Sequence, residues 1–230
     1  MKITAAVTLP ENEKTEEFIK SLSFFIIEKY ENILIRKITQ VQYSYSSKEE
    51  IKKISDRATE NARQKDGEIL STIHYNRRRM LIEEALRHFF EKNRSVNIEG
   101  FINFRLEDYK NELKNLCHDA AEELYAMREY DEFLSMLSFF ISVQSPKETV
   151  VHIVKRGGTL RLLNKRLRDI TDKYSEEALF EDESFSTEDV VLSALITIAP
   201  RKIVIHDVRD AMRIYETIIS VFPDVEFKDE

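Results

Sequence analysis

The chain has 230 residues, of which 42% are apolar and 33% charged, with only four glycines and four prolines. This composition excludes a disordered or fibrous protein and is typical of a helix-rich globular one. A chain of this length can bury about 70–75% of the surface that its unfolded form exposes, which is enough for one large domain or two small ones. The formal net charge of −7 argues against general nucleic-acid binding, which depends on a basic face that displaces counterions.

No segment predicts export or a membrane span. Residues 1–9 lack a basic stretch followed by a long apolar core, and the longest nearly apolar run, residues 190–199, is half of the roughly 20 residues that a span needs. The one cysteine, Cys117, has no partner in the chain for a disulfide. We therefore expect a cytoplasmic protein without a membrane contact.

The first region, residues 1–46, is predicted to form a small α/β unit. Residues 2–9 read as a strand, and apolar residues at helical spacing then continue to Tyr30. Residues 33–38 and 41–45 alternate with a period of two, which predicts two further strands.

The second region, residues 47–146, is predicted to be helical. Ser47 precedes Glu49 and Glu50, a favourable helix start. Two successive apolar sets with almost no connector predict a pair of antiparallel helices that ends at Pro146. The sets are Leu106, Tyr109, Leu113, Leu116, Ala120, Leu124 and Met127, and then Tyr130, Phe133, Leu134, Leu137, Phe140 and Ile141.

The third region, residues 147–230, changes to strand signals. Gly157-Gly158 between two β-rich runs predicts an antiparallel hairpin. Ser186 begins a helix that Pro200 ends, residues 202–206 form a strand, and Asp207 and Asp210 begin another helix. With a last strand near residues 225–227, this part predicts a βαβ unit of right-handed crossover.

The expected fold class is therefore a helix-rich, mixed α+β form of the α/β class. It contains an N-terminal α/β unit, central helical hairpins, and a C-terminal β-hairpin with a βαβ unit. The three regions either share one compact core or form separate ones.

Several stretches are similar to a known family. The run from Gly100 to Leu106, the residues Tyr109, Glu129-Tyr130 and Phe133, and the apolar stretch 190–200 resemble the YtxC-like sporulation protein family. The resemblance covers about residues 98–227, and its most specific part is residues 193–200. It implies an intracellular protein associated with sporulation in spore-forming bacteria, without a catalytic activity to transfer.

His206 is the leading site candidate, because the carboxyl ends of strands in open α/β sheets commonly face ligand crevices. We expect His152, in the predicted hairpin, to line the same crevice. Arg209, at the start of the following helix, could help to bind an anion there. The alternative is that Asp207 caps the helix and that His206 is simply packed.

Other candidates have plain structural explanations. Ser193 and Thr197 are further ligand-binding candidates, yet hydroxyls four residues apart on a helix also bond to backbone carbonyls. His118 should point to solvent, since it lies about 200° around the helix from Leu116. No pattern of ligands predicts a metal or another cofactor.

A basic cluster lies in the predicted hairpin and directly after it, and the acidic residues that follow favour pairing within the chain over binding of nucleic acid or another polyanion. The cluster comprises Lys155, Arg156, Arg161, Lys165, Arg166 and Arg168. The interpretation that the sequence favours is a non-enzymatic protein that binds a protein partner. The alternative is a small-molecule or metal-dependent enzyme with a crevice near His152 and His206.

Overall fold

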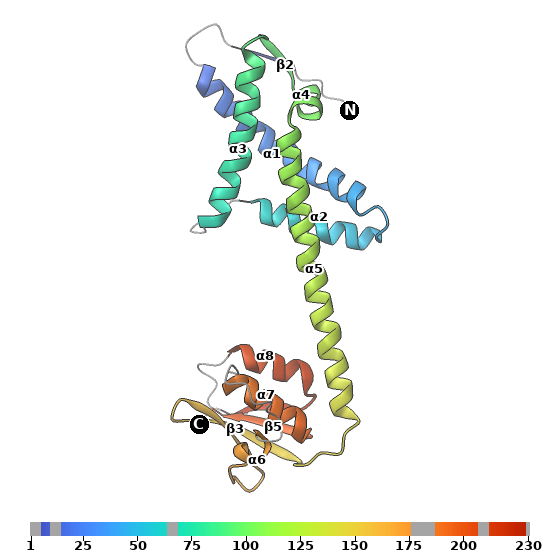
Figure 1. Cartoon of the computed structure of the whole chain (residues 1–230), viewed down its shortest axis with the longest axis vertical. Helices are drawn as coiled ribbons and strands as arrows, with labels where there is room; N and C mark the ends of the chain where they lie inside the picture. The colour runs from blue at the N-terminus through green and yellow to red at the C-terminus, as the bar shows by residue number, and fades with distance from the viewer. Residues whose placement is uncertain (1–5, 10–14, 64–68, 176–186, 207–211, 229–230) are drawn as a thin grey trace. The chain divides into compact units, whose positions relative to one another are not determined.

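The structure is a computed structural model that describes residues 6–9, 15–63, 69–175, 187–206 and 212–228. The chain divides into two compact units, Met1–Ala126 and Met127–Glu230, and helix α5 (Glu107–Ser142) runs from the first into the second. Helices predominate over two small sheets (Figure 1), which confirms the predicted helix-rich α/β class.

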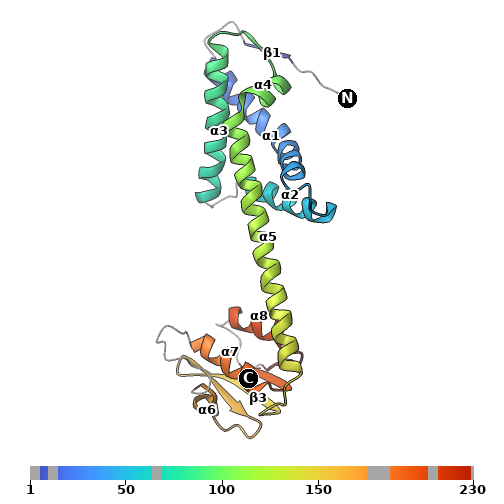
Figure 2. The same ribbon diagram turned by 45° about the vertical axis from the view of Figure 1, so that its right-hand side comes forward.

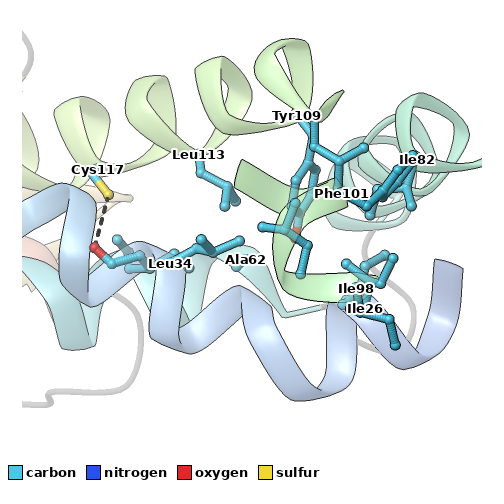
Figure 3. Close-up of a cluster of buried hydrophobic side chains, with 14 of the residues drawn as sticks. Ile26, Leu34, Ala62, Ile82, Ile98, Phe101, Tyr109, Leu113 and Cys117 are labelled. Atoms are coloured by element: carbon cyan, nitrogen blue, oxygen red, sulfur yellow. Dashed lines mark hydrogen bonds between the residues drawn. The ribbon is translucent and has the colours of Figure 1, made fainter. Parts of the chain in front are cut away.

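The first unit is built from helices that surround one apolar core. Figure 3 shows the labelled side chains of this core, which come from α1, α2, α3, α4 and α5. A short antiparallel ribbon pairs Val7 with Val96. The elements are β1 (Ala6–Thr8), α1 (Thr15–Gln42), α2 (Lys48–Ala62), α3 (Ile69–Phe90), β2 (Ser95–Asn97), α4 (Ile98–Arg105) and the N-terminal part of α5.

Helix α2 begins where the sequence predicts. The hydroxyl of Ser47 accepts a hydrogen bond from the backbone N–H of Glu50 at 3.1 Å, and Glu49 and Glu50 lie in the first turn. Both features stabilise a helix N-terminus, because they satisfy a free N–H group and complement the helix dipole.

The two strands predicted for residues 33–38 and 41–45 are wrong, because α1 continues as one helix to Gln42. Its buried face follows helical spacing through Ile27, Glu31, Leu34 and Ile35, whereas Ile33 and Val41 are exposed. Because Glu31 occupies a position on the buried face, the apolar residues alone do not show the helical period of this part of α1.

Glu31 is tolerated in the core because side chains from two other helices, Arg78 and Tyr109, donate hydrogen bonds to it. Arg78 of α3 donates from Nε to its carboxylate at 3.0 Å, and the hydroxyl of Tyr109 of α5 donates at 2.8 Å. Arg78 is only 2% exposed and also donates to the backbone carbonyl of Ala62 at the end of α2. Buried charges persist in proteins when they are paired and hydrogen-bonded in this way.

The predicted pair of antiparallel helices between Leu106 and Ile141 is also wrong, since α5 is a single helix of 36 residues. Its buried face changes along its length. Tyr109, Leu113 and Cys117 belong to the core of the first unit, whereas Leu134 and Ile141 belong to the core of the second. The sequence pattern shifts at this change of core and not at a turn.

The second unit is a four-stranded mixed sheet with helices α7 and α8 on one face (Figures 1 and 2). The strand order is β4-β3-β5-β6; β3 and β4 are antiparallel, whereas β3–β5 and β5–β6 are parallel. The elements are β3 (Val150–Arg156), β4 (Thr159–Asn164), α6 (Thr171–Ser175), α7 (Thr187–Ile198), β5 (Lys202–His206), α8 (Met212–Val221) and β6 (Val225–Lys228).

The predicted hairpin and the predicted βαβ unit are confirmed. Gly157 and Gly158 turn between β3 and β4 with φ values of 58° and 84°, which glycine adopts without strain. Helix α8 connects the parallel strands β5 and β6. The predicted helix starts at Ser186, Asp207 and Asp210 lie outside the described residues.

Candidate functional site

Strand alternation places the two candidate histidines on one face of the sheet. Val151 and Ile153 are fully buried against α7, so His152 between them points to the opposite face. His152 pairs in register with Val204 of β5, and His206 follows Val204 by two residues on the same strand. The fold therefore brings together two residues that lie 54 positions apart in the chain.

The two imidazoles contact each other directly. Nδ1 of His152 and Nε2 of His206 are 3.0 Å apart, with ring centroids at 5.3 Å and planes tilted by 36°. Such a hydrogen bond needs one protonated and one unprotonated nitrogen, so at least one ring must be neutral. The pair can hold and share a proton at this contact.

Positive charge lies beside the pair. Lys228 stands opposite His206 in the β5–β6 register, and its ammonium lies 4.0 Å from the carboxylate of Glu226, which also pairs with Lys202 at 2.6 Å. Burial lowers the pKa of His152 from its ordinary value of 6.5, and the charges of His206 and Lys228 lower it further. The site therefore favours a neutral His152.

The other predicted residues do not join this pair. Ser193 and Thr197 lie on α7, whose core residues Ala194 and Leu195 pack on the face of the sheet that His152 does not share. The hydroxyl of Thr197 donates to the carbonyl of Ser193 at 3.0 Å, the backbone bond expected of this spacing. Arg209 lies outside the described residues.

Metal-ligating side chains do not converge in the part of the chain that the structure describes. There, no three residues among the histidines, cysteines, aspartates and glutamates are placed to hold one ion. His118 is exposed, as the helical wheel predicts. In the basic cluster, Arg161 pairs with Asp172 at 3.1 Å, a contact within the chain.

Sequence reasoning missed a second feature, the outward face of α5. We use this name for Phe133, Met136, Phe139 and Phe140, together with Val143 directly after the last residue of the helix, which are between 54% and 70% exposed. Tyr130, Phe133 and Phe140 were expected in the core, and all three are exposed. The spacing 133, 136, 140, 143 could have indicated a second apolar face, because steps of three, four and three residues align along a helix.

Comparison with known proteins places the chain in a family. The sequence profile of the YtxC-like family matches residues 16–225. The chain belongs to the YtxC-like family. A Bacillus subtilis (strain 168) protein named "Uncharacterized protein YtxC" is 28% identical over 131 residues, which cover 55% of this chain and 46% of that relative. The match thus spans less than half of the relative's length.

No solved structure matches the chain. Among the helices that the structure describes, none combines the length and the apolar character needed to span a membrane.

Proposed function

We propose that this YtxC-like protein acts by binding another protein, and that the outward face of α5 is the contact surface. The observation that supports the proposal is that the last part of α5 carries exposed apolar side chains beside its buried ones. Leu134, Leu137 and Ile141 pack on the core of the second unit, while Phe133, Met136 and Phe140 are exposed. A helix that is apolar all round is normally buried, and exposed apolar patches of this kind mark interaction sites.

The shape and charge of this face favour a helical partner. Its apolar side chains follow one helix face, which an amphipathic helix with matching spacing can cover. Glu129 and Glu132 precede the apolar residues on the same side of α5, and both are exposed, although Glu132 also pairs with Arg128 at 2.9 Å. We infer a partner helix that carries an apolar stripe and basic residues at the end that meets these glutamates.

The test uses the double variant Phe133→Gln, Phe140→Gln and the control Phe104→Gln. Phe104 is 83% exposed in the first unit, against 54% for Phe133 and 55% for Phe140, so the control removes an exposed aromatic side chain that is not part of the outward face. Each protein is used to recover partners from sporulating cells. The recovered candidate is then purified, and its affinity for all three proteins is measured by calorimetry.

We expect the purified partner to bind the wild type and the control equally and to bind the double variant at least about tenfold more weakly, because truncating buried aromatic anchors costs 2 kcal/mol or more. Equal affinity of the double variant would remove α5 as the contact surface. A concentration-dependent dimer of the wild type that the double variant does not form would replace the partner helix with a second copy of this chain.

We place this binding in sporulation because the family resemblance implies it. Spore counts from cells that carry the double variant should fall relative to the Phe104→Gln control at equal protein abundance. Unchanged spore yield would argue against this role.

A second candidate function is the binding or conversion of a small molecule at the histidine pair. The direct contact of two imidazoles beside Lys228 supports it, since such a group can transfer a proton to a bound ligand. Replacement of His206 by Gln keeps a hydrogen-bonding side chain at the strand end. Wild-type spore yield from this variant would remove the site from consideration.

A further inference from the structure

A basic pocket lies between α1 and α2 in the first unit. The two helices are joined as a hairpin by residues 43–47 (Figure 2). The pocket has a volume of about 380 Å³. It is lined by Arg36 and Gln40 of α1 and by Lys48, Ile51, Lys52, Ser55 and Asp56 of α2.

Three positive side chains converge on this pocket. Lys48 and Lys52 are one helical turn apart and so project from the same side of α2, opposite Arg36. Asp56 is the one acidic lining residue, which leaves two net positive charges in a chain whose total is −7.

The three positive side chains of the pocket are not neutralised by ion pairs within the described parts of the chain. Arg36, Lys48 and Lys52 form no ion pair with another described residue. Arg57, on the next turn of α2, shows the contrast, since it pairs with both Glu60 and Glu123. Three unpaired cations held together repel one another, and a bound anion would relieve that repulsion.

Ser55 supplies an independent observation. It lines the pocket and is only 4% exposed, yet its hydroxyl has no hydrogen-bond partner. Thr39, in the same core, shows the usual arrangement, because its hydroxyl donates to the carbonyl of Ile35 at 2.8 Å. A buried hydroxyl without a hydrogen-bond partner destabilises the folded state by about 1–3 kcal/mol, and a bound ligand or water can supply the missing hydrogen bond.

We propose that this pocket binds a phosphate-type anion, with Arg36, Lys48 and Lys52 as charge partners and the Ser55 hydroxyl as a further donor. Arginine and lysine are the usual protein partners of phosphate oxygens. The phosphate can belong to a free small molecule or to a lipid headgroup. Val41, in the last turn of α1, and Tyr45, in the segment between α1 and α2, are 77% and 79% exposed and could contact a lipid surface.

The test is a pair of binding measurements on the full chain. Pyrophosphate is titrated by calorimetry, and sedimentation is measured with phosphatidylglycerol–phosphatidylcholine vesicles and with pure phosphatidylcholine vesicles. The variant is Arg36→Gln, Lys52→Gln. The matched control is Lys37→Gln, Lys53→Gln, which removes the same charge from the adjacent positions that do not line the pocket.

We expect binding of pyrophosphate or of the anionic vesicles that weakens about tenfold in the variant and is retained in the control. Binding of pyrophosphate identifies a free anion as the ligand, and binding of the anionic vesicles alone identifies a headgroup. Ser55→Ala should also weaken binding without unfolding the protein, since its hydroxyl has no partner to lose. The proposal is overturned if neither probe binds, if the control loses as much affinity as the variant, or if Ser55→Ala binds as tightly as the wild type.

Discussion

At residue scale, the contact between His152 and His206 makes the protonation of each ring depend on the other. When both rings are protonated, two N–H groups face each other across a distance of 3.0 Å and the hydrogen bond is lost. Burial and the neighbouring positive charges already lower the pKa of His152. The folded protein therefore binds a proton at His152 less readily than the unfolded chain does.

We predict that this difference destabilises the second unit in acid. The contribution of His152 is fully present above the ordinary pKa of 6.5 and is lost as the pH falls through the lower pKa of the folded state. Denaturant unfolding at pH 8 and at pH 5 should show a smaller acid-induced loss in His152→Gln than in the wild type. His118→Gln, at an exposed position on α5, is the control and should behave as the wild type does.

Equal acid-induced losses in the wild type and in His152→Gln would contradict this account.

The sequence allows the histidine pair to be predicted but not the pair Arg78–Glu31. His152 and His206 stand at regular positions of strands whose alternation can be read from their neighbours. Arg77, Arg78 and Arg79 fan around a helix, and nothing local shows that the middle one is buried. Its burial depends on Glu31, which lies 47 residues away.

At the scale of elements, α7 is a helix whose buried face can be predicted from the spacing of its apolar residues. Its apolar run ends at Pro200, and Val191, Ala194, Leu195 and Ile198 are buried at steps of three, one and three residues. Here the core face contains only apolar side chains. In α1 the buried face includes Glu31 and Thr39, and in α5 the buried face changes from one core to another, so that local periodicity misleads in both.

The replacement Leu195→Ala tests the packing of α7 on the sheet. Leu195 is fully buried, so the change removes buried carbons and leaves a cavity. We expect the free energy of unfolding to fall by about 2–5 kcal/mol in denaturant titrations. Ile219→Ala, on the exposed side of α8, should cost less than about 1 kcal/mol. A Leu195→Ala protein as stable as the wild type would refute the core position.

At the scale of the whole molecule, the described residues form two apolar cores with no residue in common. One gathers side chains from α1 to α4 and the N-terminal part of α5, and the other surrounds the mixed sheet. The YtxC-like profile matches sequence in both units. The composition predicts the fold class, whereas the partition into cores depends on contacts between residues far apart in the chain.

Separate cores predict separate responses to core mutations, which hydrogen exchange can resolve by segment. Leu113 is fully buried in the first core and Leu195 in the second. Leu113→Ala should raise amide exchange in α1, α3 and the N-terminal part of α5, and Leu195→Ala should raise it in β3, β5 and α7. The destabilisations should add in the double variant, because distant sites without shared partners behave independently. If either single replacement raised exchange equally in both units, the molecule would unfold as one cooperative whole, and the division into two cores would have no energetic meaning.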